Sequence, residues 1–419
     1  MKILFLSQYY SPEMGAPAAR VSELSQHWVR FGHHVTTLTG FPNHPTGVVY
    51  PGYMTKFRHM IYHERTEGVR VVRTWLYPLP NRKSHERIMN YSSFFLSSCI
   101  TGSFLSNPDI IIATSPQLLV GLSGWWLGLI KRKPFILEIR DIWPESITAS
   151  GVGQKTSMLT RSLSALSGFL YQTCTHLVVV TPAFKEDIVN KFDIKPEKIS
   201  VVSNGVETDL FRPKSRTNKA KGALGLEGRF VVSVIGTMGL AHGLDTVVEA
   251  AAQFKESFTK IIFLFVGEGA DRERLTKLSQ DKGLSNVRFL PKQPREKIPD
   301  FISASDICLV MLRKANIFKT VIPTKMLEFM ACGRPVILGV DGQARHIMEQ
   351  AGAGIFVEPE NVTALVEAVT ELYYDEERRE RLGINGRDYI VKNLSRKQTA
   401  KEYVGVLEKV ISRWKKKHI

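Results

Sequence analysis

Short apolar runs recur along the whole chain, and turn residues separate them from stretches with helical spacing. The first series of runs occupies residues 3–6, 35–39, 69–74, 110–113, 135–139, 176–180 and 199–202. Runs without polar alternation are typical of parallel strands that are covered on both faces. Val21, Leu24 and Trp28 show the helical spacing expected between two such strands. The pattern predicts an α/β fold in which residues 1–205 form a doubly wound, Rossmann-like sheet.

A second series follows a turn-rich, basic segment at residues 204–228. Its runs occupy residues 230–235, 261–266, 287–290, 307–311, 336–338 and 354–357. We therefore expect a second Rossmann-like domain over residues 206–395, with a ligand cleft between the carboxyl edges of the two sheets. Residues 396–419 contain an amphipathic helix whose apolar stripe includes Tyr403 and Trp414, and we expect it to pack back on the N-terminal domain.

Length, charge and cysteine content narrow the class of protein. The chain has 419 residues, more than one hydrophobic core usually supports, so two domains are expected. Its formal net charge of +16 favours an anionic partner, which could be a nucleic acid, a nucleotide-sugar or an anionic membrane surface. The four cysteines are scattered without metal-binding spacing, which indicates reduced thiols and no metal centre. The sequence shows neither a signal peptide nor a membrane-spanning run, so a cytoplasmic protein is expected.

One short segment has the pattern of an anion-binding helix. Pro323 suits the first turn of a helix over residues 324–331, and Cys332-Gly333 ends it. The free N–H groups of the first turn, the Thr324 hydroxyl and the Lys325 ammonium together suit a phosphate.

Glu328 lies one turn further along the helix face that carries Lys325. Its carboxylate could accept hydrogen bonds from the vicinal hydroxyls of a ribose behind the phosphate, which is the arrangement of a nucleoside diphosphate site. The alternative is an ordinary helix between two strands, with a solvated lysine and glutamate. The spacing by itself leaves both interpretations open.

Glycine-rich turns follow two successive strands of the second series. Gly236-Thr237-Met238-Gly239 follows the run at 230–235, and Gly267-Glu268-Gly269 follows the next run. Such turns let backbone N–H groups point at a phosphate. Gly15-Ala16 is a comparable small-residue turn after the first strand. Each turn could simply be tight, but two of them together with the Lys325 helix favour a donor phosphate site. The GxGxxG pattern of dinucleotide-binding folds is absent.

A polar cluster follows the apolar run at residues 135–139, at a strand end where cleft residues are expected. It contains Arg140, Asp141 and Trp143. Beside Arg140, the Asp141 carboxylate is expected to keep a low pKa and to be ionised. Asp141 could then orient an acceptor hydroxyl, act as a base, or simply cap the next turn.

Basic residues beside an aromatic-rich helix suggest a surface that lies against lipid headgroups. The residues that carry this pattern are Arg82, Lys83, Arg87, Phe94 and Phe95. A weaker second instance is Trp125-Trp126 followed by Lys131-Arg132-Lys133. The alternative is a set of core helices with solvated charged ends. The sequence contains no recognised nucleic-acid-binding motif, so no nucleic-acid partner is expected.

Several longer segments resemble the retaining glycosyltransferases of family four. They include MKILFLSQYYSPEMGAPAARVSEL, IRDIWPES, VVSNGVETDLFRP, LFVGEGADRERL and IPTKMLEFMACGRPVI, in the family's order. The resemblance is greatest to bacterial members that assemble O-antigen and capsule repeat units, among them L-fucosamine transferases. It implies the two-domain GT-B architecture, a nucleotide-sugar donor, and a lipid-linked or oligosaccharide acceptor. It also implies that Glu328 binds the ribose as the second Glu of an E-x7-E motif, and that Gly15-Ala16 faces the donor phosphates.

The chain departs from the family pattern at positions that bind phosphate. Thr320 replaces the first Glu of the motif, and Thr237 and His242 stand where members commonly carry an Arg and a Lys. A His of the family is also replaced, at Arg140-Asp141. We therefore expect Lys325 and the backbone of the glycine turn to hold the diphosphate. A metal-held diphosphate is unsupported because the sequence has no DxD motif.

These observations together predict a retaining enzyme that transfers an N-acetylated, UDP-linked sugar without a cofactor, at the inner face of the plasma membrane. Its expected catalytic residues are Asp141, Lys325 and Glu328, and Arg140 and Trp143 are expected to bind the acceptor. Two alternatives remain. One is a sugar-nucleotide epimerase of the same architecture, which would need no acceptor, and the other is a non-enzymatic module that binds anionic surfaces.

Overall fold

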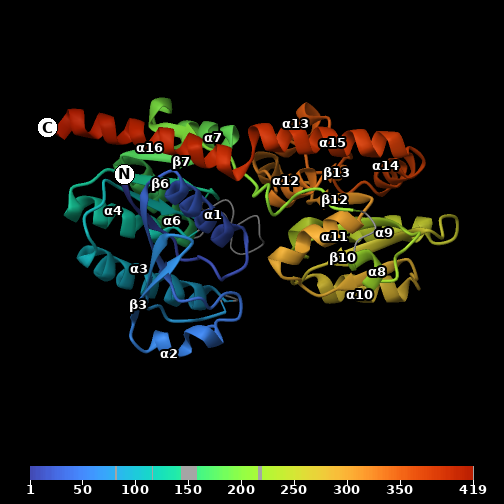
Figure 1. Cartoon of the computed structure of the whole chain (residues 1–419), viewed down its shortest axis with the longest axis horizontal. Helices are drawn as coiled ribbons and strands as arrows, with labels where there is room; N and C mark the ends of the chain where they lie inside the picture. The colour runs from blue at the N-terminus through green and yellow to red at the C-terminus, as the bar shows by residue number, and fades with distance from the viewer. Residues whose placement is uncertain (81–82, 116, 143–157, 216–218, 419) are drawn as a thin grey trace. The chain divides into compact units, whose positions relative to one another are not determined.

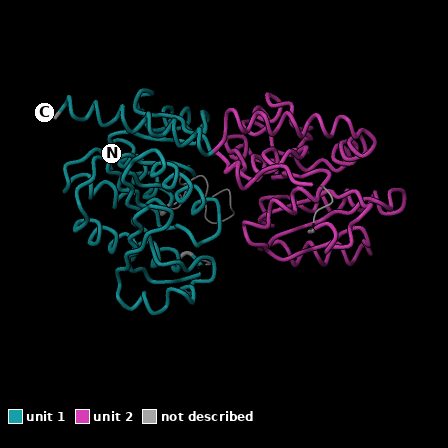
Figure 2. The backbone as a smooth tube through the Cα atoms, viewed as in Figure 1, with its two compact units in different colours: residues 1–204, 396–419 teal, residues 205–395 magenta. Residues whose placement is uncertain are grey.

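The computed structural model describes residues 1–80, 83–115, 117–142, 158–215 and 219–418 (Figure 1). The chain forms two compact units. Unit 1 comprises Met1–Asn204 together with Arg396–Ile419, and unit 2 comprises Gly205–Ser395 (Figure 2). The polypeptide therefore leaves unit 1 once, builds unit 2, and returns to unit 1 for its last helix.

The described part of unit 1 contains an eight-stranded sheet with the order β3-β4-β2-β1-β5-β6-β7-β8. Its strands are β1 Lys2–Leu6, β2 His34–Gly40, β3 Ile61–Thr66, β4 Val69–Thr74, β5 Ile110–Thr114, β6 Phe135–Ile139, β7 His176–Val179 and β8 Ile199–Val201. The central strand β1 pairs in parallel with β2 and β5, so Leu4 lies opposite Thr36 on one side and Ile111 on the other. The predicted strands of this domain are confirmed, because apolar runs form where a strand is covered on both faces.

The edge strand β3 was not predicted from the apolar pattern. Its sequence IYHERT is mostly polar, and its residues are alternately exposed and half-buried. β3 pairs antiparallel with β4, and Glu64 of β3 binds Arg73 Nε of β4 at 2.6 Å. An edge strand needs apolar cover on fewer sides than a central one, so backbone pairing defines it rather than a run of apolar residues.

Helices cover both faces of the unit 1 sheet. They are α1 Ala16–Arg30, α2 Met54–Phe57, α3 Ser84–Phe104, α4 Leu119–Lys131, α6 Met158–Thr173, α7 Pro182–Phe192 and α16 Arg396–His418, with short 3-10 turns η1 Pro51–Tyr53 and η2 Pro196–Lys198. The C-terminal helix α16 packs on α1 (Figure 1). Trp28 of α1 lies edge-on to Tyr403 with ring centroids 5.2 Å apart, and its Nε1 donates to Ala400 O at 3.1 Å.

Unit 2 contains an all-parallel sheet whose order is β11-β10-β9-β12-β13-β14. Its strands are β9 Phe230–Ile235, β10 Ile261–Val266, β11 Val287–Leu290, β12 Ile307–Met311, β13 Val336–Gly339 and β14 Gly354–Phe356. Its helices are α8 Lys219–Ala223, α9 Asp245–Phe254, α10 Arg272–Asp281, α11 Ile298–Ala304, α12 Thr324–Ala331, α13 Gln343–Ala351, α14 Val362–Tyr374 and α15 Glu376–Asn393, with 3-10 turns η3 Leu240–His242, η4 Arg295–Lys297 and η5 Asn316–Thr320. The predicted strands of the second domain and the predicted helix over 324–331 are confirmed.

A buried ion pair inside unit 1 joins α1 to β6. Arg20 Nη2 lies 2.8 Å from Glu138 Oε1, and both side chains are excluded from solvent. Burial by itself would raise the pKa of Glu138, but Arg20, together with the charge of Arg140 and a hydrogen bond from Thr114, holds the net pKa below its usual value. The same guanidinium donates to Val202 O, Ser203 O and Asn204 Oδ1 at 3.1–3.2 Å. Arg20 therefore also fixes the segment through which the chain leaves unit 1.

The segment that returns to unit 1 is fixed by the same helix. Glu23 of α1 accepts a hydrogen bond from Arg396 Nε at 2.8 Å, and both side chains are largely buried. Arg396 is the first residue of α16. Helix α1 thus holds both chain segments that connect unit 1 to the rest of the polypeptide.

We expect Arg20→Leu to lower the free energy of unfolding of unit 1 by about 3–5 kcal/mol, because it leaves the buried Glu138 carboxylate without its cation. Urea unfolding followed by circular dichroism measures the change. The matched control is Lys191→Ala, which removes a partly exposed i,i+4 pair with Asp187 on α7 and should change stability by less than about 1 kcal/mol. Equal effects of the two substitutions would contradict the assignment of Arg20.

Candidate functional site

The turns that follow β9 and β10 lie against each other at the carboxyl edge of the unit 2 sheet. Gly236 N donates to Val266 O at 2.9 Å, and Met238 N donates to Glu268 O at 2.9 Å. Gly267 has a φ of 148°, and a Cβ added to it would lie 1.9 Å from Gly236 O. Only glycine allows this approach of two backbones. Gly267 therefore has a packing role. The sequence pattern alone could not distinguish this role from phosphate binding.

Lys325 extends from the first turn of α12 to the turn after β9. A Cβ added to Gly236 would lie 3.8 Å from Lys325 Cδ, so the lysine stem passes directly beside this turn. Lys325 Nζ is buried, and no hydrogen-bond partner for it exists among the residues that the structure describes. Burial lowers its pKa to about 8. A buried, unpaired ammonium is costly, and here it stands where an anion would supply the missing partner.

The start of α12 offers further groups to an anion. Pro323 directly precedes the helix, and no side chain caps its first turn. Thr324 is half-buried at the first helical position, next to Lys325. The positive end of the helix dipole therefore lies at the same place as the unpartnered ammonium.

His242 lies at the end of the 3-10 turn η3 and closes the glycine turn. Gly239 N donates to His242 Nδ1 at 3.3 Å. Burial, and then the positive charge of Lys325, lower the pKa of His242 to about 4, so the ring is neutral at neutral pH. Thr237, the other residue of this turn that replaces a basic residue common in the family, is exposed. Arg313 Nε also donates to Leu240 O of this turn at 2.7 Å, but its guanidinium is paired with Asp245 and Glu360. Lys325 Nζ, in contrast, has no partner among the described residues.

Glu328 is half-buried and forms an ion pair that the sequence did not reveal. Arg295 Nη1 lies 3.1 Å from Glu328 Oε1, and the Arg295 guanidinium stacks over the Phe211 ring with 5.0 Å to its centroid. Arg295 belongs to η4, shortly after β11. The sequence feature that could have pointed to Arg295 is a basic residue shortly after the carboxyl end of a strand. Glu268, the remaining predicted donor residue of unit 2, is exposed and lies 3.8 Å from Arg272 Nε.

In unit 1, Gly15 and Ala16 mark the start of α1, with Gly15 as its N-cap at a φ of 147°. Glu13, in the same loop, is buried and was missed. Its Oε1 accepts hydrogen bonds from Asn43 N and His44 N at 2.9 Å, and its Oε2 has no partner among the described residues. Burial raises the pKa of Glu13 to about 7. A carboxyl group that titrates near neutrality is a candidate acid or base.

The acceptor candidates Arg140 and Asp141 follow the carboxyl end of β6. Arg140 N donates to Ser115 Oγ at 2.7 Å, and its Nε and Nη1 are buried without partners among the described residues. Burial lowers the pKa of Arg140 to about 10. The expectation of a low pKa for Asp141 is wrong, because burial raises this pKa by more than Arg140 lowers it. Trp143 lies outside the described residues.

The residues that were predicted to face the membrane differ in their exposure to solvent. Lys83 is exposed, Arg87 and Phe95 are half-buried, and Arg82 lies outside the described residues. The assignment of Phe94 is wrong: its side chain is fully buried. Phe94 shares its helix face with the buried Asn90, Ser98 and Thr101, and Ser98 Oγ bonds Ser123 Oγ of α4 at 2.8 Å.

The face of α3 that is exposed instead is apolar. It carries Ile88, Met89, Leu96, Ile100 and Phe104. Phe104, the last residue of the helix, is 88% exposed. Among the described helices, none combines the length and the apolar character that crossing a bilayer requires.

Two family models match successive parts of the chain. Residues 15–205 match the model described as "Glycosyl transferase 4-like domain", and residues 216–389 match the model described as "Glycosyl transferases group 1". A related protein is the "Putative colanic acid biosynthesis glycosyl transferase WcaI" of Escherichia coli K12. It is 25% identical over 385 residues, which are 88% of this chain and 92% of WcaI.

Solved structures show the same fold. Sucrose-phosphate synthase from Thermosynechococcus elongatus is 20% identical, with a TM-score of 0.77 over 98% of this chain and 99% of that one. HepE of Anabaena, solved in complex with UDP-glucose, is 16% identical, with a TM-score of 0.73 over 98% of this chain and 100% of that one. The fold of the chain is thus the two-domain GT-B fold.

The affinity of the site for a nucleoside diphosphate such as UDP should depend on pH through Lys325. An anion prefers the charged lysine, so UDP affinity should be constant well below pH 8 and fall as pH rises through the lysine's pKa of about 8. The limiting slope is about tenfold per pH unit. Calorimetric titration at pH 6.5 to 9 measures the change.

The control for this prediction is Lys325→Arg, which keeps its charge over the whole range and should therefore remove the loss of affinity. A wild-type slope in this variant would assign the pH dependence to another group.

Proposed function

Because this chain belongs to the glycosyltransferases that combine a 4-like domain with a group 1 domain, we propose that it transfers an N-acetylated sugar from a UDP donor to a lipid-linked or oligosaccharide acceptor. We further propose that the product belongs to a bacterial surface polysaccharide such as O-antigen or capsule. The observation that carries the proposal is the Lys325 ammonium, which is buried at the start of α12 beside the turn after β9 and has no partner among the described residues.

Three kinds of support apply to different parts of the proposal. The name of WcaI assigns it to colanic acid biosynthesis, which supports a surface polysaccharide. HepE, with the same fold, was solved with UDP-glucose, which supports a UDP-sugar. The motif order of the sequence resembles L-fucosamine transferases, which supports an N-acetylated sugar.

In the proposed reaction, the bond between the anomeric carbon and the diphosphate oxygen breaks, and its electron pair leaves with the diphosphate. Lys325 and the first turn of α12 stabilise the negative charge that grows on the leaving group. Because that charge is larger in the transition state than in the bound donor, fixed positive groups accelerate the step. The diphosphate also supplies the partner that Lys325 Nζ lacks.

The donor ribose would bind Glu328, and this requires a rearrangement of the ion pair with Arg295. The two side chains are 3.1 Å apart, so the ribose hydroxyls must share the carboxylate with Arg295 or displace it. Neither side chain is fully buried, so the Glu328 carboxylate can adjust while Arg295 keeps its contact with the buried Phe211 ring. Binding of the donor ribose would therefore change the contact between Arg295 and Glu328.

The acceptor hydroxyl would attack on the face from which the diphosphate leaves, which retains the anomeric configuration. Its proton would pass to the departing diphosphate, so the step needs no separate protein base. Arg140 and Asp141 would position the acceptor in unit 1. The raised pKa of Asp141 favours an orienting hydrogen bond over a role as a strong ion-pairing group.

The family of the chain favours transfer over the two other interpretations of the sequence. An epimerase would convert a UDP-sugar without an acceptor. A module that only binds anionic surfaces has no need of a buried lysine at a helix start that lacks a partner among the described residues.

We expect Lys325→Ala to lower kcat/KM by about 100-fold or more, the scale of losing one group that stabilises a developing anion. Turnover of UDP-N-acetylhexosamines with a polyprenyl-diphosphate-linked acceptor provides the assay. UDP should raise the melting temperature of the wild type but not of this variant.

The matched control is Lys319→Ala, a lysine of the same unit that is about half-exposed and pairs with Asp341. Its activity should stay within about twofold of wild type, because an exposed pair contributes little. Full activity of Lys325→Ala would remove this lysine from the mechanism.

We also propose peripheral contact with an anionic membrane through the exposed face of α3. The double substitution Ile100→Ser with Phe104→Ser should reduce flotation with phosphatidylglycerol vesicles, because both side chains are exposed and apolar. High salt should weaken the remaining flotation. Tyr374→Ser, at an exposed position of unit 2, is the control, and no binding of the wild type at low salt would refute the contact.

A further inference from the structure

A cavity of about 620 Å³ lies in unit 1, at the end of the sheet opposite to the proposed acceptor residues. Asp109 precedes β5, Phe135 begins β6, and Thr175 precedes β7, so the cavity lies at the amino edge of the strands. Arg140 follows the other end of β6. The five residues of β6 separate the two places by roughly 16 Å, at about 3.3 Å per residue.

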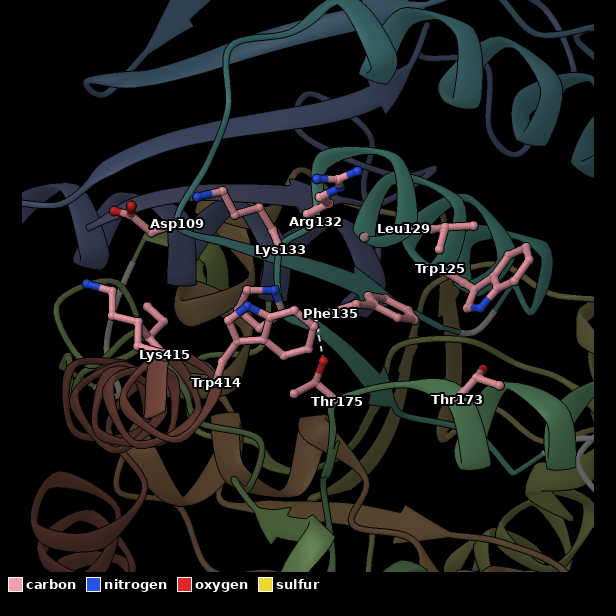
Figure 3. Close-up of a pocket in the computed structure, with 13 residues that line it drawn as sticks. Asp109, Trp125, Leu129, Arg132, Lys133, Phe135, Thr173, Thr175, Trp414 and Lys415 are labelled. Atoms are coloured by element: carbon pink, nitrogen blue, oxygen red, sulfur yellow. Dashed lines mark hydrogen bonds between the residues drawn. The ribbon is translucent and has the colours of Figure 1, made fainter. Parts of the chain in front are cut away.

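The walls of the cavity are aromatic and aliphatic. Trp125 of α4 and Trp414 of α16 lie on opposite sides of Phe135 (Figure 3). Trp125 packs edge-on against Phe169 of α6 with 5.3 Å between ring centroids. Phe135 N donates to Thr175 Oγ1 at 3.0 Å (Figure 3). These contacts hold the walls in place, and a cavity of this size suits a small-molecule ligand.

The rim of the cavity has an excess of positive charge. Arg132, Lys133 and Lys415 line it, and no ion pair or side-chain hydrogen bond engages their cationic groups within the described part of the chain. The single lining carboxylate, Asp109, accepts a hydrogen bond from Lys2 N at 2.7 Å. A ligand that combines an anionic group with an apolar part would match both the rim and the walls.

The surroundings of the cavity are apolar and exposed. Leu129 lines the cavity and is 60% exposed, and Trp126 and Ile130 of the same helix are exposed beside it. Lys131 Nζ donates to Ser103 O and Leu105 O, which fixes the end of α4 beside the exposed Phe104. The cavity thus opens next to an apolar surface formed by α3 and α4, which a water-borne anion would not require.

We propose that this cavity binds an anionic phospholipid from the membrane surface. The headgroup phosphate lies on Lys133 and Lys415, which extend to the same side of the cavity (Figure 3), and the first part of an acyl chain lies against Trp125, Phe135 and Trp414. This inference rests on the proposed membrane contact, but it concerns a separate site for one lipid molecule. Contact through α3 alone requires no cavity and no preference among anionic lipids.

Native mass spectrometry of the full chain in mild detergent tests the inference. We expect one phosphatidylglycerol molecule to remain bound, with phosphatidylcholine binding at least about tenfold more weakly. The double variant Lys133→Glu with Lys415→Glu should lower phosphatidylglycerol affinity at least about tenfold. Lys416→Glu with Lys417→Glu changes the net charge equally on residues outside the cavity lining, and it should retain wild-type affinity.

Thr173→Trp tests the cavity apart from its charge. Thr173 is exposed at the cavity rim, so a larger side chain can fill the cavity without disturbing the core. This variant should lose phosphatidylglycerol binding in detergent while it still floats with vesicles. Retained binding in this variant, equal loss in both double-charge variants, or equal affinity for the two lipids would overturn the inference. Loss of flotation in the Ile100→Ser, Phe104→Ser variant tests only the proposed membrane contact.

Discussion

A lysine ammonium that is held out of water, with no partner in the part of the chain that the structure describes, is the constraint on which the proposed site depends. Helix α12 cannot rotate to release it, because Met326, Leu327, Phe329 and Met330 are buried in the unit 2 core. Lys325 and Glu328 therefore stay on the other face of the helix. Burial costs free energy, but a pKa of about 8 still leaves the ammonium charged at neutral pH. The core thus maintains a positive charge that a bound diphosphate can neutralise.

In the proposed site, the same part of unit 2 would compensate for the chain's departures from the family pattern. The ring of His242 is neutral and closes a turn, so it does not replace a lysine as a cation. Gly267 lets the two glycine turns meet backbone to backbone, which fixes the position of the turn beside Lys325. At the proposed site, phosphate binding would then depend on one buried cation and one helix terminus, and less on a group of exposed charges.

The two edges of the unit 1 sheet carry different surfaces, a polar one at the carboxyl ends of the strands and an aromatic cavity at their amino ends. Its carboxyl edge carries Arg140 and Asp141, and the loop after β1 carries Glu13, whose pKa burial raises to about 7. Its amino edge carries the aromatic cavity with a basic rim. Helix α1 holds the chain segments at both crossings through Arg20 and Glu23. An acceptor and a membrane lipid could therefore bind the same unit without competing for the same residues.

The sequence by itself determined the strands of both sheets except the polar edge strand β3, the bounds of α12 and the position of the glycine turns. These features depend on the order of apolar, helix-forming and turn residues over a few neighbouring positions. Tertiary structure decided the rest. Whether Phe94 faces solvent depends on the packing of α3 on α4, and the pKa of Asp141 depends on how far burial outweighs Arg140. Glu328 pairs with Arg295, 33 positions away, and Arg20 pairs with Glu138, 118 positions away. These pairs form only when elements distant in the sequence pack together. Burial and charge pairing are properties of the assembled core, so no local pattern could have shown them.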